Sequence, residues 1–289
     1  MPEGHTIHRL ARDLRRDLAG QVVAVTSPQG RFSGGASQID GFRLLSAEAY
    51  GKHLLIDFEP PAPDGVLHIH LGLFGRFTRF ADGAPSRSEK SSIANEVSGA
   101  SSVRLRLAAA GWAWQLSGPT VCAFVNDQEL RKLRDRLGPD PLRSNADPAL
   151  FVASVRASRR AIGALLLDQS IVAGIGNVYR SELCYRLRLD PRTPGNELSA
   201  DEVRWLWDDA VALLTIGVRL GRIVTVDAVG DRSTKGSGRR RNTVADLPAG
   251  KRVSVYRRDH CLGCGAEVER FDLGNRWAYV CPVEQPSQS

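Results

Sequence analysis

Two prolines within four residues, in Gly138-Pro139-Asp140-Pro141, divide the chain into parts with different hydrophobic periods. Before this break, short apolar runs such as Val66–Leu71 alternate with glycine and proline, which is typical of a sheet-rich domain. After it, apolar residues repeat at helical spacing, and Ser199 with Glu202 forms a capping box ahead of one repeat. The sequence therefore predicts a sheet-rich part, then a helical part, then a small C-terminal unit.

The charge of the chain favours a polyanionic partner, because its 289 residues carry a net charge of +7. The longest apolar stretch, Ala161–Leu167, is far shorter than the roughly 20 residues of a membrane-spanning helix. The N-terminus becomes amphipathic at once and builds no apolar signal segment, so we expect a cytoplasmic protein. Five cysteines are an odd and sparse set, which argues against a disulfide scaffold.

The first candidate for chemistry is the amino terminus. Proline at position 2 is small enough for the initiator methionine to be removed, which would leave Pro2 with a free secondary amine. Such an amine titrates near pH 8, so a nucleophilic fraction exists at neutral pH. Its adduct with a sugar carbon is an iminium, the electron sink that a lyase step requires, and Glu3 beside it offers a carboxyl for proton transfer. The alternative is a common start with no chemical role.

Three further segments carry polar or unusual residues. Lys52 lies between a glycine and an apolar strand, where it is either a solvated lysine or a cation for phosphate. His68 and His70 share one strand face, but no clear third metal ligand lies nearby, so satisfied strand histidines are the main interpretation. Leu73 and Phe74 stand between two glycines at a turn, and an apolar pair there can act as a wedge in a base stack.

The helical part contains a turn with Gly174 and Gly176, followed by a helix that starts near Asn177. Glycines allow a ligand to approach the backbone, and the free N–H groups of a helix start suit a phosphate. The motif is weak by itself, and no strand precedes it as a dinucleotide fold would require.

The C-terminal unit contains three quarters of a zinc ribbon, in Cys261, Cys264 and Cys281. A fourth cysteine is expected at position 284, where Glu284 stands instead. Glu284 or His260 could complete a zinc site, or the tail holds together through its apolar residues without metal. Arg276, on the turn between two expected strands, can reach a phosphate in either case.

The order of these motifs resembles the formamidopyrimidine-DNA glycosylase and endonuclease VIII family of base-excision repair enzymes. The resemblance covers nearly the whole chain, and the Met-Pro-Glu-Gly start and the Gly-Ile-Gly-Asn turn are its most specific parts. It implies an α+β fold with an N-terminal β-sandwich, a helix–two-turn–helix domain and a zinc-finger-like β-hairpin, with DNA in the cleft between them. The boundaries we expect are 1–137, 138–229, a basic linker at 230–250, and 251–289.

The resemblance also implies roles for the residues at matching positions. Pro2 would attack C1′ of the damaged nucleotide with Glu3 as acid/base partner, and Lys52 would assist the lyase step, which proceeds by β- and δ-elimination. The DNA contacts it implies are made by His70, Asn177, Arg276 and Glu182, with Leu73 and Phe74 filling the gap left by an extruded base. One structural Zn²⁺ would be held by Cys261, Cys264, Cys281 and Glu284. The partner would be double-stranded DNA with damaged bases or abasic sites, bound by a monomer.

Some positions depart from the family pattern. His5-Thr6 stand where the family often has Pro-Glu, and residues 222–250 lack a match to the loop that caps 8-oxoguanine. The missing loop and the Leu73-Phe74 pair favour oxidised pyrimidines over oxidised purines as substrates. The alternatives are a formamidopyrimidine- and 8-oxoguanine-type glycosylase, or a nucleic-acid-binding protein of the same fold that has lost catalysis.

Overall fold

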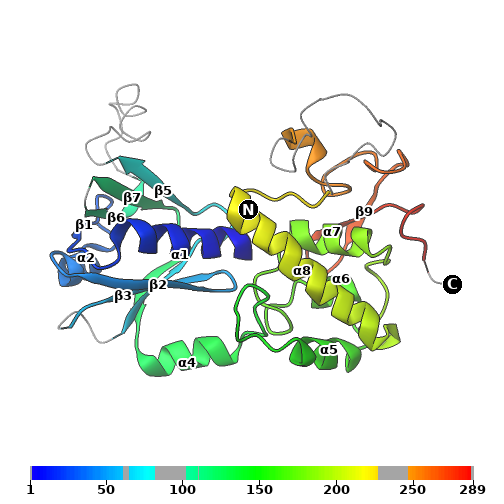
Figure 1. The fold of residues 1–289 in the computed structure, drawn as a ribbon, viewed down its shortest axis with the longest axis horizontal. Helices are drawn as coiled ribbons and strands as arrows, with labels where there is room; N and C mark the ends of the chain where they lie inside the picture. Colours follow the sequence, from blue (N-terminus) through cyan, green and yellow to red (C-terminus); the bar gives the residue numbers. More distant parts are fainter. Residues whose placement is uncertain (1, 61–64, 82–101, 110, 227–246, 288–289) are drawn as a thin grey trace, which may run out of the picture. The chain divides into compact units, whose positions relative to one another are not determined.

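The computed structural model describes residues 2–60, 65–81, 102–109, 111–226 and 247–287 (Figure 1). The chain divides into two compact units, 1–136 and 137–289, which are described separately. The expected basic linker at 230–250 lies mostly outside the described residues, so the finer division of the second unit stays a prediction.

The first unit begins with helix α1, Gly4–Leu18, whose residues Ile7, Ala11, Leu14 and Leu18 form a buried stripe at helical spacing. The helix packs against β2 and β3 (Figure 1). Side chains from α1 and from both sheets of this unit meet in the same hydrophobic core, which makes the unit a β-sandwich with a leading helix. The predicted α+β class is therefore confirmed.

The strands of the described part of the first unit form two antiparallel sheets of four strands each. The sheet orders are β1-β6-β7-β5 and β2-β3-β4-β8. The strands are β1 Ala24–Thr26, β2 Leu44–Tyr50, β3 His53–Phe58, β4 Val66–His70, β5 Arg76–Ala81, β6 Val103–Ala109, β7 Trp112–Ser117 and β8 Val121–Val125, and two short helices, α2 Ser33–Ile39 and α4 Asp127–Asp135, complete the unit.

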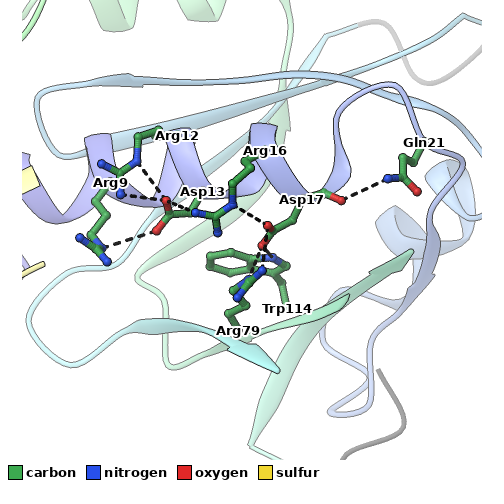
Figure 2. Close-up of polar contacts among 8 residues, drawn as sticks. All are labelled: Arg9, Arg12, Asp13, Arg16, Asp17, Gln21, Arg79 and Trp114. Carbon is green, nitrogen blue, oxygen red and sulfur yellow. Dashed lines mark hydrogen bonds and ion pairs between the residues drawn. The ribbon is translucent and has the colours of Figure 1, made fainter. Parts of the chain in front are cut away.

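A buried carboxylate fixes α1 to the sheet that contains β5 and β7 (Figure 2). Asp17 accepts hydrogen bonds from Trp114 Nε1 at 3.1 Å, Arg79 Nη2 at 3.0 Å and Arg16 Nε at 3.0 Å. Burial alone would raise the pKa of Asp17, but the hydrogen bonds from Arg79 and Arg16 outweigh it and hold that pKa below its usual value. The helix that starts next to Pro2 is thus anchored at its far end.

The second unit opens with helices around their own core. Asp147 caps α5, Pro148–Arg156, and the predicted capping box of Ser199 and Glu202 starts α8, Ala200–Leu220. Within the described residues, no helix combines the length and apolarity needed to cross a bilayer. The remaining helical elements are α6 Ile162–Leu165, α7 Asn177–Arg186 and the 3-10 turns η1 Gly195–Glu197 and η3 Ala249–Lys251.

The second unit also contains the predicted β-hairpin, formed by β9, Glu269–Asp272, and β10, Trp277–Val280. Arg276 lies in the turn between these strands, as the sequence predicts. A small core that includes Val255, Val268 and Cys281 supports the hairpin.

Candidate active site

Pro2 and Glu3 lie directly before α1, so the first turn of this helix determines their position. Glu3 occupies the N-cap position, its side chain is fully buried, and its carbonyl oxygen accepts a hydrogen bond from Thr6 N at 2.9 Å. Pro2 is half-buried and lines a cavity of about 390 Å³. The site therefore holds a carboxyl group away from water beside the start of the chain.

The same cavity is lined by the two apolar residues of the β4–β5 turn. Leu73 is 49% and Phe74 is 89% exposed, which is a large solvent-exposed apolar surface for a turn. Gly72 precedes them with a φ of 65°, and a side chain at this position would also collide with Thr120. The turn thus projects Leu73 and Phe74 beside the cavity that Pro2 lines.

His5 is a buried histidine one turn from the amino terminus, only 4% exposed. Its Nε2 lies 3.2 Å from Thr6 Oγ1. Burial, followed by the positive charges of the chain N-terminus and Arg9, lowers the pKa of His5 to about 4. The imidazole is therefore neutral at pH 7 and adds no positive charge beside the terminal amine.

Lys52 lies in a two-residue hairpin turn between β2 and β3, because Tyr50 pairs directly with His53. Gly51 takes a φ of 55° there, the left-handed conformation that such a tight turn requires. The turn places Lys52 half-buried at the end of the same sheet that carries His70.

His70 belongs to a cluster of three histidines that strand register brings together. His53 pairs with His70 across β3 and β4, and His53 Nδ1 lies 2.9 Å from His68 Nε2. Burial, with repulsion from neighbouring positive charge, lowers the pKa of His53 to about 3 and of His68 to about 4. His70 Nδ1 accepts a hydrogen bond from Gly72 N at 3.2 Å, so the neutral ring carries its proton on Nε2, where it can donate.

In the second unit, Asn177 does not stand alone at the start of α7. Its Nδ2 donates to the carbonyl oxygen of Trp277 at 3.0 Å, and its Oδ1 accepts a hydrogen bond from Arg180. The fully buried Arg180 also donates to the carbonyl oxygens of Leu273 at 2.9 Å and Trp277 at 2.8 Å. These carbonyls flank the turn that carries Arg276, so α7 fixes this turn through Arg180. Arg180 was not among the residues identified from the sequence.

Glu182 is buried, which does not fit the contact with DNA that the sequence led us to expect. It is 0% exposed, and its two carboxylate oxygens accept four hydrogen bonds. The donors are Thr225 Oγ1 and the backbone N–H groups of residues 254–256, at 2.6 to 2.9 Å. The structure therefore supports a structural role for Glu182, because its carboxylate is enclosed by the segment before the hairpin.

Among the described residues, the side chains close enough to share a metal ion are the thiols of Cys261, Cys264 and Cys281. Their Sγ atoms all lie within 4.8 Å of one another, with Cys264 and Cys281 at 3.4 Å. Three thiols at this spacing fit a tetrahedral Zn²⁺, whose Zn–S bonds measure about 2.3 Å. Glu284 lies outside this group and pairs with Arg188 at 3.6 Å.

Comparisons with known proteins agree along the whole chain. Residues 1–115 match the formamidopyrimidine-DNA glycosylase N-terminal domain, and residues 137–228 match the formamidopyrimidine-DNA glycosylase H2TH domain. Endonuclease 8 1 of Mycobacterium tuberculosis is 42% identical over 99% of this chain and 100% of its own length. Probable endonuclease 8 2 of Streptomyces coelicolor is 33% identical over 99% of this chain and 94% of its own length.

A solved structure shares the fold. The Lactococcus lactis Fpg protein, determined in complex with DNA that contains an abasic site, superimposes with a TM-score of 0.72 at 22% identity. The match covers 99% of this chain and 100% of the Lactococcus protein. At this identity the likeness concerns the fold alone.

Proposed function

The chain belongs to the formamidopyrimidine-DNA glycosylase and endonuclease 8 family of DNA glycosylases, and on this premise we propose that it removes oxidised pyrimidines and then cleaves the strand. The observation that carries the proposal is the cavity of about 390 Å³ shared by Pro2, Leu73 and Phe74. A nucleophile and an apolar wedge at one cavity suit an enzyme that extrudes a nucleotide and fills the gap it leaves.

The chemistry starts at the Pro2 nitrogen after removal of Met1. The nitrogen forms a bond to C1′ while the bond from C1′ to the base breaks, and the departing base takes a proton. Glu3, fully buried beside Pro2 in sequence, supplies and accepts protons at the sugar. The C1′–O4′ bond then breaks, a proton passes to O4′, and an iminium between Pro2 and C1′ remains. The iminium acidifies C2′, so loss of a C2′ proton breaks the C3′–O bond, and a second elimination breaks the C5′–O bond.

In this proposal the protein binds DNA through cations and hydrogen-bond donors that contact the phosphates. Lys52 at its hairpin turn and the Nε2–H of His70 serve the strand near the reacting sugar. Arg276 and the second N–H of the Asn177 amide, whose first N–H binds the Trp277 carbonyl, hold the phosphates beside the extruded nucleotide. Because such contacts release counterions, affinity for duplex DNA should fall steeply with salt. The protein would act as a monomer on damaged double-stranded DNA, at the nucleoid in the cytoplasm.

The similarity to Endonuclease 8 1 over the full chain supports the pyrimidine branch. The segment without a match to a purine-capping loop, 222–250, lies mostly outside the described residues and stays a sequence argument. Single-turnover excision from duplexes containing 5-hydroxycytosine or 8-oxoguanine distinguishes the branches. Faster excision of 8-oxoguanine would favour the purine alternative.

Zinc has a structural place in this proposal. Cys261, Cys264 and Cys281 would hold one Zn²⁺, with Glu284 as the fourth ligand, since its pair with the exposed guanidinium of Arg188, 3.6 Å long, is weak enough to be exchanged for a metal bond. The bound ion would cross-link the segments that carry these cysteines and would take no part in catalysis. It would thereby stiffen the base of the hairpin that carries Arg276.

The general test is strand cleavage on duplexes that contain thymine glycol or an abasic site. We expect a one-nucleotide gap with phosphate at both ends, and we expect Glu3→Gln to lose base removal. Damage-independent binding without cleavage by the wild-type protein would overturn the proposal and favour the inactive binding protein.

A further inference from the structure

Trp277 places a large apolar side chain in solvent on a backbone that is held firmly in place. The residue directly follows Arg276 at the start of β10, and it is 55% exposed. Its carbonyl oxygen accepts hydrogen bonds from Arg180 Nη2 at 2.8 Å and Asn177 Nδ2 at 3.0 Å. The indole is thus presented to solvent from a fixed backbone position, which lowers the entropic cost of binding a ligand.

The two faces of the hairpin differ in what they expose. Ala278 and Val280 point inward and are each 1% exposed, whereas Trp277 and Tyr279 alternate with them on the other face. Arg270 pairs with Tyr279 across the hairpin, and its guanidinium carbon lies 5.6 Å from the centre of the Trp277 ring. This distance is typical of a cation–π contact, which orients the indole.

We propose that the Trp277 ring stacks on an unpaired base of bound DNA, next to the phosphate that Arg276 holds. The inference rests on the proposed function, because it needs a DNA strand at Arg276. Asp272 pairs with Trp277 across the strands, while Arg270 contacts the ring and Arg276 precedes it in the chain, so two arginines and one carboxylate are its charged neighbours on the hairpin. An aromatic ring flanked by arginines is the combination that binds the bases and the backbone of unpaired strands.

The test uses a duplex with tetrahydrofuran, an abasic-site analogue that the enzyme does not cleave. The fluorescent base 2-aminopurine is placed in turn on each side of the analogue and opposite it. The variants are Trp277→Leu, which keeps an apolar side chain without an aromatic face, and Trp277→Phe, which keeps an aromatic face. Trp205→Leu is the matched control, since Trp205 on α8 is 58% exposed.

With the wild-type protein we expect 2-aminopurine to be quenched at one of these positions. Trp277→Leu should lose this quenching and bind the duplex roughly 5- to 150-fold more weakly, while Trp277→Phe and the control keep both. Equal binding and quenching in Trp277→Leu would overturn the proposal. So would a change in self-association by sedimentation without a change in DNA binding, because Trp277 would then serve a protein interface.

Two further measurements keep the result interpretable. Comparison of Trp277→Leu with Trp277→Phe in thermal unfolding shows whether the leucine variant is folded, and if it is not, Trp277→Met takes its place as a second apolar variant without an aromatic face. Failure of the proposed function would appear separately, as wild-type protein that binds the analogue duplex but never cleaves a thymine glycol duplex.

Discussion

Arg180 donates its Nη2–H to the carbonyl oxygen of Trp277 at 2.8 Å, across 97 residues of sequence. With the second bond, from Arg180 Nη1 to the carbonyl oxygen of Leu273, a buried guanidinium closes both sides of the turn that carries Arg276. The helix that starts at Asn177 and the C-terminal hairpin therefore behave as one mechanical element within the second unit.

Replacing Arg180 by methionine should loosen this turn. The change leaves two carbonyl oxygens without their charged donor, and hydrogen bonds of this kind contribute about 1.5–3 kcal/mol each. We expect the free energy of unfolding to fall by roughly 3 kcal/mol, with weaker DNA binding, in denaturant titrations and binding assays. Arg204→Met is the control, because Arg204 and Asp208 form an exposed pair, and its effect should stay within about 0.5 kcal/mol. Equal effects of both variants would contradict the account.

Glu182→Gln separates a structural role from a contact with DNA. The amide would turn an N–H group toward donors that now bind the carboxylate, so we expect a loss of roughly 3 kcal/mol in the free energy of unfolding. Glu267→Gln, at an exposed position, should be neutral. A Glu182→Gln protein with wild-type stability and impaired DNA binding would show instead that this carboxylate contacts DNA.

Acid should destabilise the first unit through His5. Its pKa is lowered to about 4 in the folded chain, below the usual 6.5, so the unfolded state binds the proton first as the pH falls. The free energy of unfolding should be unaffected above pH 6.5 and should decline toward pH 4, by up to about 1.4 kcal/mol per pH unit. Between pH 6 and pH 5, His5→Gln should therefore show a shallower decline than wild type in urea titrations. Parallel curves would refute a buried, neutral His5.

Zinc binding should depend on the three thiols and on Glu284. We expect about one zinc per chain in protein purified without chelator, with Cys264→Ser losing the metal. Glu284→Gln should release zinc to a competing chelator at least about tenfold more readily. If Glu284→Gln holds zinc as wild type does, the fourth ligand is another group, and His260 is the next residue to replace.

Local patterns in the sequence were sufficient for much of the fold. The stripe from Ile7 to Leu18 predicts α1, and Ser199 with Glu202 predicts the start of α8, because periodicity and capping involve neighbours within a turn or two. The hairpin with Arg276 at its turn also follows from local sequence.

The contacts that hold the candidate sites together depend on distant partners. Arg180 and Glu182 lie three and five residues after Asn177. The carbonyls that Arg180 binds and the donors that Glu182 binds are more than 40 residues away, so the motif could not reveal their roles. His53 became a neighbour of His68 through the register of β3 and β4. In α7 the charged residues Arg180 and Glu182 stand between the apolar residues Tyr179 and Leu183, and this placement was the available signal of a buried polar anchor.

The most direct test of the central claim is to locate the covalent bond to DNA. An abasic-site duplex is treated with the protein and borohydride, and the trapped adduct is digested and mapped by mass spectrometry. We expect a chain that begins at Pro2 and carries the sugar fragment on its N-terminal peptide. An adduct at Lys52, or fully active protein that still retains Met1, would contradict it.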